Sequence, residues 1–152
     1  MAYCSREFCR YVNGSLIDEE CTTDYEQSDV KYVVDNWATS EFELNILKEA
    51  RLITFDELIN YLNFESHQEC TGSCSTKYSK SEYTPSWVYG DYWYWTMSQS
   101  YDNTSQVWIV GYEGDLHSFD TLHVGSYGGK DSYDSATGVI RPVITIKKRA
   151  IN

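Results

Sequence analysis

The sequence predicts an α+β domain, and three observations carry that prediction. Residues 30–37 place valines and a tryptophan at the i, i+3, i+4, i+7 spacing of an amphipathic helix, whereas residues 92–98 alternate as a strand does. Two short apolar runs, at 50–53 and 139–146, each lie beside or contain one arginine and look like two strands of one domain. With 152 residues, the chain has the length of one ordinary domain with a core of its own.

The first 28 residues are polar and acidic. We expect residues 1–28 to form an edge ribbon of the same domain, whose main part spans residues 29–152. Asn13-Gly14 predicts a turn between the runs at 8–12 and 15–17, which is a hairpin signal.

Two helix N-termini can be read from side-chain spacing. Ser28 can cap the helix predicted over residues 30–37. Thr54 is followed three residues later by Glu57, which is a capping box in which each side chain accepts the other residue's backbone N–H. The run 50–53 is expected to be a strand that leads into this second helix.

The second half of the chain reads as a β-meander with polar loops. Residues 64–81 are expected to form a polar loop, and in 92–98 the face with Trp93, Trp95 and Met97 is expected to be core. Further strands are expected at 107–110, 116–124 and 139–146, with a Gly-, Ser- and Asp-rich loop at 126–138. The side chains that we expect to be buried are Trp37, Leu52, Leu58, Trp95, Trp108, Val143 and Ile144.

The charge argues against two classes of partner. There are 23 acidic and 12 basic residues, so the net charge is −11, which repels nucleic acid and anionic membrane surfaces. The one basic cluster, Lys147-Lys148-Arg149, is interpreted as a solvated tail. No run reaches the ~18 apolar residues that span a bilayer, so neither nucleic-acid binding nor direct membrane insertion is expected.

Five cysteines leave several pairings open. Cys70 and Cys74 enclose small residues, which predicts a loop-stapling disulfide and an oxidising compartment. Cys21 can pair with Cys4 or Cys9. Reduced cysteines and a zinc site of Cys4, Cys9, Cys70 and Cys74 are the alternatives, although the spacings fit zinc poorly. A bridged chain is expected at the cell surface, outside the cell or on a phage particle, as the exported portion of a longer precursor or as a particle component.

Several motifs resemble one known family. Ala50-Arg51-Leu52-Ile53-Thr54 with Glu57 resembles the Arg-Leu-Pro-Thr-x-x-Glu helix entry of the formylglycine-generating-enzyme branch of the C-type lectin-like fold. Gly138-Val139-Ile140-Arg141 resembles that branch's closing Gly-Phe-Arg strand, with one extra residue. The ordered set of residues 50–54, 94–96, 107–110 and 139–146 is most similar to bacterial (Firmicutes) prepilin-associated surface domains and to variable proteins of diversity-generating retroelements.

The resemblance implies two helices that flank a twisted, mainly antiparallel sheet. It also implies a non-catalytic module that binds a protein or a glycan through variable loops of its C-terminal half. The chain lacks the family's calcium-binding tripeptide and its Trp-Asn-Asp motif, and no cysteine follows Cys74 to form the copper pair of the catalytic branch. We therefore expect no cofactor, no metal and no enzymatic activity.

Two other functions are weighed against this one. The first is an enzyme, either of the formylglycine-generating-enzyme-like branch or an unrecognised hydrolase, for which His67, His117 and His123 are the candidate bases near neutral pH. No Gly-x-Ser-x-Gly turn accompanies these histidines. The second is a structural subunit of a pilus or a phage particle, whose aromatic face packs against a neighbour.

Candidate ligand-binding residues combine polar or aromatic tips with loop or strand-edge positions. The chain has 14 tyrosines, which offer large contact area with few rotatable bonds. The residues that we expect to bind the ligand are Ser100, Tyr101, Asn103, Tyr112, His117, Asp120, His123, Tyr127 and Tyr133.

Overall fold

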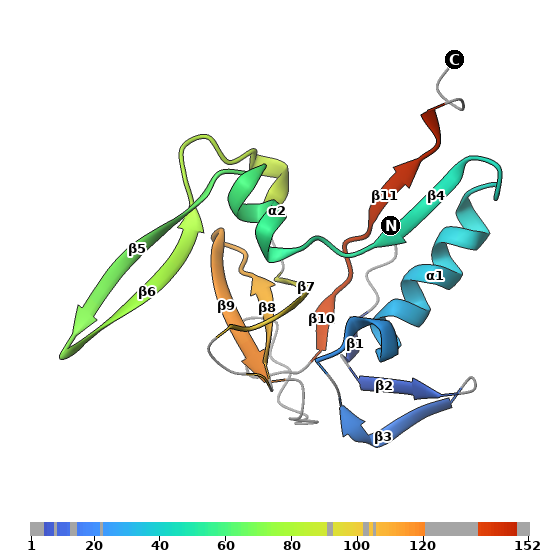
Figure 1. The fold of residues 1–152 in the computed structure, drawn as a ribbon, viewed down its shortest axis with the longest axis horizontal. Helices are drawn as coiled ribbons and strands as arrows, with labels where there is room; N and C mark the ends of the chain where they lie inside the picture. The colour runs from blue at the N-terminus through green and yellow to red at the C-terminus, as the bar shows by residue number, and fades with distance from the viewer. Residues whose placement is uncertain are drawn as a thin grey trace.

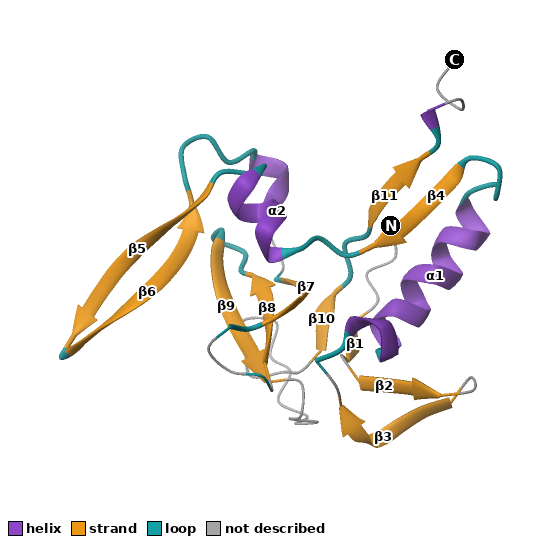
Figure 2. Ribbon diagram, viewed as in Figure 1, coloured by secondary structure: helices purple, strands orange, loops and turns teal. Residues whose placement is uncertain are grey.

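Both α-helices of the described chain lie in its first half, and the second half is mainly strand, a segregation typical of the predicted α+β class (Figure 2). The structure is a computed structural model that describes residues 5–7, 9–12, 15–21, 23–90, 93–101, 104, 106–120 and 137–148. The predicted class, with two helices and a mainly antiparallel sheet, is confirmed.

A seven-stranded sheet runs through the described part of the chain (Figure 1). In spatial order its strands are β1 (Ser5–Glu7), β10 (Thr137–Val139), β7 (Tyr94–Gln99), β8 (Gln106–Val110), β9 (Asp115–Asp120), β6 (Ser73–Lys80) and β5 (Phe64–Thr71). Neighbouring strands are antiparallel except β10 and β7, which are parallel. Because β1 pairs with β10, segments near the two ends of the chain meet in one sheet.

Two small sheets complete the fold. In the first, β11 (Val143–Ile146) pairs with β4 (Leu47–Arg51), with Ile144 opposite Ala50. This confirms that the two runs lie side by side. The single strand predicted at 139–146 is wrong, because it is interrupted at 140–142, where Pro142 lies: Val139 ends β10, and Arg141 lies between β10 and β11. In the second, β2 (Cys9–Val12) pairs with β3 (Ser15–Cys21), which confirms the predicted hairpin and places the backbones of Cys9 and Cys21 opposite each other.

Both predicted helix caps are present. In α1 (Asp29–Glu41), Ser28 Oγ accepts a hydrogen bond from the Lys31 N–H at 3.1 Å. In α2 (Phe55–Asn60), Thr54 Oγ1 accepts the Glu57 N–H at 3.1 Å and the Glu57 carboxylate accepts the Thr54 N–H at 2.9 Å. Two single-turn 3₁₀ segments, η1 (Tyr25–Gln27) and η2 (Ser86–Val88), precede α1 and β7.

An arginine ties the end of β4 to the start of α2. The Arg51 guanidinium donates to both Glu57 oxygens, at 2.9 and 2.6 Å, and to the Leu52 carbonyl at 2.9 Å. This two-pronged contact lowers the pKa of Glu57 from its ordinary 4.5 to about 2, with the Arg51 hydrogen bonds as the largest cause. The carboxylate that completes the capping box is therefore held ionised.

The central strands are buried on both faces. Trp95, Val107 and Ile109 pack with residues of α1 in one cluster, whereas Tyr94 and Trp108 pack with residues of α2 in another. Successive strand residues point to opposite faces, so α1 and α2 cover opposite sides of β7 and β8.

This arrangement corrects part of the predicted core. Tyr94 and Thr96, predicted to face away from the core, are buried because α2 covers their side, and Trp93 and Met97 are only partly buried. Burial of Leu52, Leu58, Trp95 and Trp108 is confirmed. Trp37, Val143 and Ile144 are only partly buried.

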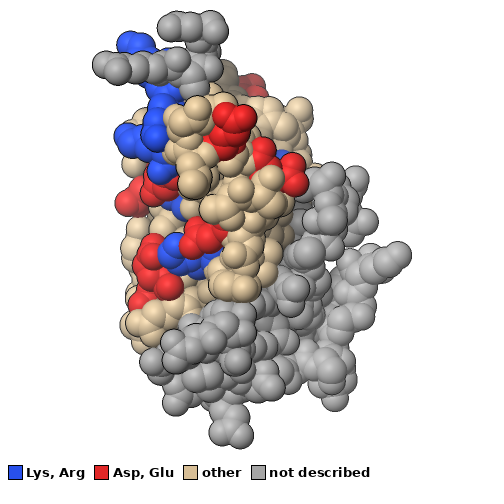
Figure 3. All heavy atoms as spheres, turned by 90° about the vertical axis from the view of Figure 1, so that its right-hand side faces the viewer, with Lys and Arg blue, Asp and Glu red and all other residues tan. Residues whose placement is uncertain are grey.

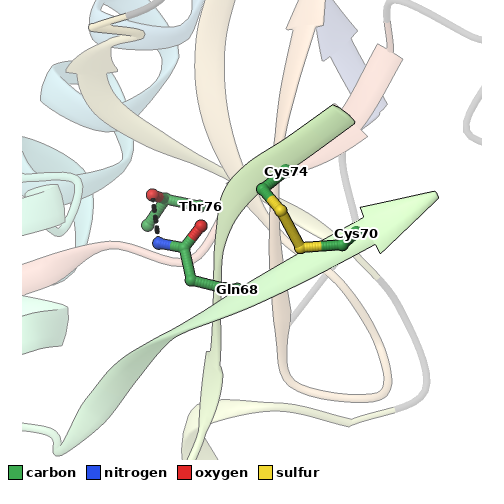
Figure 4. Close-up of a disulfide and its surroundings, with 4 residues drawn as sticks. All are labelled: Gln68, Cys70, Cys74 and Thr76. Carbon is green, nitrogen blue, oxygen red and sulfur yellow. Dashed lines mark hydrogen bonds between the residues drawn. A yellow bond between two sulfur atoms is a disulfide. The ribbon is translucent and has the colours of Figure 1, made fainter. Parts of the chain in front are cut away.

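A hairpin stands where a loop was predicted. Residues 64–80 form β5 and β6, a hairpin that we call the β5–β6 arm. From Glu65 to Lys77 every side chain is exposed. The arm therefore has no apolar stripe from which its strands could be predicted. The predicted Cys70–Cys74 disulfide is present and closes its tip, where the two cysteines are cross-strand partners (Figure 4). One step towards the body, Gln68 Nε2 donates to Thr76 Oγ1 at 2.9 Å. Gly72 takes φ +97° at the turn, a conformation that suits glycine.

The surface charge is mixed on the face that carries α1. Acidic and basic side chains lie side by side there (Figure 3), and Lys31 contacts Asp35 at 2.6 Å and Glu26 at 3.7 Å. Within the described part of the chain, no helix is long and apolar enough to cross a membrane.

Candidate functional site

A hollow lies where the β5–β6 arm leaves the sheet. β8 pairs with β9 from Leu116 to Asp120, but β6 pairs with β9 only through Tyr78–Leu116 and Ser79–Asp115. Beyond that point the arm and β9 diverge (Figure 1). The resulting cleft has a volume of about 180 Å³ and is lined by Thr76, Lys77, Tyr78, Trp108, Leu116, His117 and Ser118.

An aromatic cluster borders the cleft. Trp108 is only 5% exposed, and its ring centroid lies 5.0 Å from that of Phe55, 5.9 Å from Tyr78 and 6.5 Å from Tyr101. The indole N–H of Trp108 has no hydrogen-bond partner among the described residues. The packing of the four rings therefore fixes the positions of Trp108 and Tyr78, the two rings that line the cleft.

Helix α2 fixes the position of this cluster. The Phe55 N–H donates to Ser98 Oγ at 2.9 Å, which joins the start of the helix to β7. The Tyr101 hydroxyl donates to Asp56 Oδ1 at 3.1 Å, although the Tyr101 side chain is 65% exposed. Partial burial, and then this contact with a carboxylate, raise the pKa of Tyr101, so its hydroxyl stays protonated and can donate.

The other sides of the cleft are polar. Asp115 and His117 are hydrogen-bonded along β9, and this bond is the largest cause of a lowered Asp115 pKa. Lys77 on β6 makes no ion pair with any residue that the structure describes. Hydroxyls of Thr76 and Ser118 complete the lining. Such a surface offers an apolar contact, hydrogen-bond donors and one cation to a ligand.

Some of the predicted ligand-binding residues meet at the cleft. His117 lines it, and Tyr101 packs on the cluster at its side. Tyr112 is 43% exposed in the turn between β8 and β9. Ser100 is 3% exposed, and its N–H donates to the Gln106 carbonyl at 2.8 Å.

The structure does not describe the side chains of the remaining predicted ligand-binding residues. The backbone of Asp120 lies opposite Gln106 at the end of β9. The predictions for Asn103, His123, Tyr127 and Tyr133 fall outside the described residues.

The sequence did not predict that residues of β6 line one side of the cleft. Thr76, Lys77 and Tyr78 lie in the segment predicted to be a loop, and only their pairing with β5 and β9 brings them to the cleft. The one local signal was Tyr78 itself, the sole aromatic residue between Glu65 and Lys80.

His117 and Ser118, both in the lining of the cleft, do not form a catalytic pair. His117 and Ser118 are successive residues of β9 and so point to opposite faces of the sheet. They therefore do not form the serine–histidine pair that a hydrolase needs. No group of three or more His, Cys, Asp or Glu residues in the described ranges is arranged to hold a metal ion.

Comparisons with protein-family models, with curated proteins and with solved structures found no match to this chain.

Proposed function

We propose that this chain is a non-catalytic binding module of the C-type lectin-like type, which recognises a protein or glycan ligand through the cleft beside Trp108. The observation that carries the proposal is an aromatic cluster, with Tyr101 exposed at its edge, that borders a hollow with polar walls. Binding sites commonly combine an apolar base with a few convergent polar groups.

The fold supports the same proposal. Trp108 lies on a strand that is buried on both faces, and Tyr101 is tied to α2 through Asp56, so the contact surface is positioned before a ligand arrives. The Cys70–Cys74 disulfide supports a location at the cell surface or outside the cell, where disulfides persist. The resemblance of the motifs at 50–57 and 138–141 to the lectin-like family supports the type of module.

The test compares two tyrosines that flank the same helix. The purified chain is screened against an array of glycans and an array of peptides, and any hit is titrated in solution. Tyr101→Ala is expected to weaken binding by about 2 kcal/mol, roughly thirtyfold, as the loss of an aromatic hot-spot residue does. Tyr61→Ala, at the opposite end of α2 and 77% exposed, is the control and should leave affinity within twofold.

Tyr61→Ala should unfold at the midpoint of the parent protein, because its side chain lies largely in solvent. Tyr101→Ala loses its contacts with Phe55 and Asp56, so circular dichroism at the assay temperature is used to show that this variant is folded. Equal affinity of the parent and the Tyr101→Ala protein for every hit would place the binding surface elsewhere on the molecule.

A further inference from the structure

The cleft has main-chain hydrogen-bonding groups along one wall. The Gly111 N–H donates to the Asp115 carbonyl at 2.7 Å and the Lys80 N–H donates to the Gly114 carbonyl at 2.6 Å. Antiparallel pairing alternates direction along a strand, so odd-numbered residues of β9 direct their main-chain groups to β8 and even-numbered residues direct theirs to β6. Past Leu116, the main-chain groups of Ser118 and Asp120 therefore face the cleft, and no described strand pairs with them.

The edge of β6 on the opposite side of the cleft also directs main-chain groups towards the cleft. Tyr78 pairs with Leu116, so the next residue of β6 that directs its main chain towards β9 is Thr76. Two strand edges thus diverge from one root, and no strand within the described ranges pairs with the backbone positions between them. An exposed strand edge is a template on which another extended segment can pair.

The side chains that line the cleft divide by face. Tyr78, Leu116 and Trp108 belong to the sheet face covered by α2, and Ser118 lies opposite Trp108 on that face. Lys77 and His117, each adjacent to one of these residues along its strand, lie on the other face. Successive side chains of an extended peptide also point to opposite faces. Two neighbouring residues of such a ligand would therefore meet the aromatic face and the polar face of the cleft, respectively.

We propose that the cleft binds an extended peptide strand that pairs with the edge of β9 and carries an acidic residue next to an apolar or aromatic one. The apolar residue lies against Tyr78 and the exposed edge of Trp108, and the acidic residue faces Lys77, because His117 on the same face is already hydrogen-bonded to Asp115. This inference rests on the proposed binding function and specifies its ligand as a peptide.

Net charge limits how the acidic residue is recognised. The chain carries −11, which opposes the approach of an acidic peptide at long range. Glu65 and Glu69 flank His67, the cross-strand partner of Lys77, on the same face of the arm, and Glu69 lies 3.8 Å from His67. At physiological ionic strength charges more than about 8 Å apart are largely screened, so selectivity depends on direct contact with Lys77.

The experiment measures binding of three synthetic octapeptides by isothermal titration or fluorescence polarisation. The first has a central glutamate–phenylalanine pair in a serine–threonine background, the second has lysine in place of glutamate, and the third repeats the first with N-methyl groups on alternate amides. The first peptide is expected to bind at least tenfold more tightly than the other two. Exchange of the charge removes the contact to Lys77, and N-methylation removes the strand pairing without altering the side chains.

Exchange of the charge on the protein gives the matched control. Lys77→Glu is expected to reverse the preference, so that the lysine peptide binds at least tenfold more tightly than the glutamate peptide. Lys148→Glu makes the same charge change on an exposed lysine outside the cleft and should keep the parent preference within twofold. Near-ultraviolet circular dichroism of both variants confirms that each is folded.

The outcomes separate this inference from the proposed function. Equal binding of the three peptides, or an unchanged preference in Lys77→Glu, overturns the inference. Binding of an oligosaccharide from the glycan array that is lost in Tyr101→Ala, with no peptide binding, overturns the inference but supports the proposed function. Failure of every peptide and every glycan to bind overturns both.

Discussion

The Glu57 carboxylate closes a capping box and an ion pair at once. It accepts the Thr54 N–H and both guanidinium prongs of Arg51, so it joins the strand before α2 to the first turn of the helix. Glu57→Gln keeps the shape of the side chain but removes its charge. We expect a loss of about 1–3 kcal/mol in the free energy of unfolding at pH 7, because hydrogen bonds to charged groups contribute that much.

The same contact predicts how stability depends on pH. The folded-state pKa of Glu57, about 2, lies below its ordinary 4.5, so its contribution is complete above pH 4.5 and is lost as the pH falls towards 2. Denaturant titrations of the parent and Glu57→Gln proteins should therefore converge across that window. Glu49→Gln, which changes an exposed carboxylate 3.5 Å from Arg51, is the control and should cost less than about 1 kcal/mol. A constant difference down to pH 2 would contradict this assignment.

Both the backbone conformation at position 114 and the side chain packed against it favour glycine. Its φ is +84°, and a Cβ added to it would lie 2.5 Å from Lys80 Cδ. Lys80 also places its Nζ 3.9 Å from the centre of the Tyr89 ring, so its side chain cannot move without losing that contact. Gly114→Ala is expected to destabilise the protein by about 1–3 kcal/mol in a denaturant titration.

Gly90 provides the comparison for this substitution. A Cβ at Gly90 meets nothing within 4 Å and its φ is not in the left-handed region. Gly90→Ala should therefore stay within about 0.5 kcal/mol of the parent protein. Equal costs at the two positions would show that neither φ nor Lys80 governs the effect.

At the scale of elements, the Cys70–Cys74 disulfide is expected to contribute more to the stability of the β5–β6 arm than to that of the rest of the fold. An isolated two-stranded hairpin is only marginally stable in water, and every side chain of the arm from Glu65 to Lys77 is exposed. The bridge closes a small ring, for which the chain-entropy model gives about 2 kcal/mol. We predict that reduction, or the double change Cys70→Ser with Cys74→Ser, abolishes slow amide exchange in residues 65–77 and leaves exchange in β7 and β8 unchanged.

Two measurements check this prediction. Mass spectrometry of the mature protein should show Cys70 and Cys74 joined, and hydrogen exchange followed by mass spectrometry should localise the loss of protection to the arm. Uniform loss of protection throughout the sheet would mean that the bridge supports the whole fold.

At the scale of the whole molecule, one sheet joins two cores. Leu52 lies in the cluster on the α1 side and Leu58 in the cluster on the α2 side, and both are fully buried. Because β7 and β8 contribute side chains to both clusters, damage to either is expected to destabilise the other. Leu52→Ala and Leu58→Ala should each cost about 2–5 kcal/mol, as truncation of a buried leucine does.

Cooperativity is the decisive part of that prediction. Tryptophan fluorescence and far-ultraviolet circular dichroism should report one coincident transition in each variant. Leu44→Ala, at an exposed position, is the control and should leave the midpoint unchanged. Two separated transitions would mean that the clusters unfold independently.

The parts of the fold that could be predicted from the sequence are those with short-range signals. Ser28 and the Thr54–Glu57 pair identify helix starts because a cap acts within three residues. Burial of Tyr94 could not be read from β7, because it depends on a helix that covers the second face of the strand.

The candidate site was predictable to a smaller extent. Tyr101 and His117 were selected by the chemistry of their side chains, which the sequence shows directly. Lys77 and Tyr78 were not, because an arm exposed on both faces carries no hydrophobic alternation and its pairing with Leu116 joins distant parts of the chain.

The β5–β6 arm is joined to β9 through only two residue pairs, so a small rotation at this root moves its tip by a larger distance. Its strands extend about 20 Å from the paired residue Tyr78 to the tip, so a rotation of about 10° at the root would displace the tip by about 3.5 Å. Contacts at the root, such as that between Lys80 and Gly114, therefore set the angle at which the cleft opens. Under the proposed function, a substitution at the root of the arm is expected to change which ligands fit the cleft, although it lies outside the surface that would touch them.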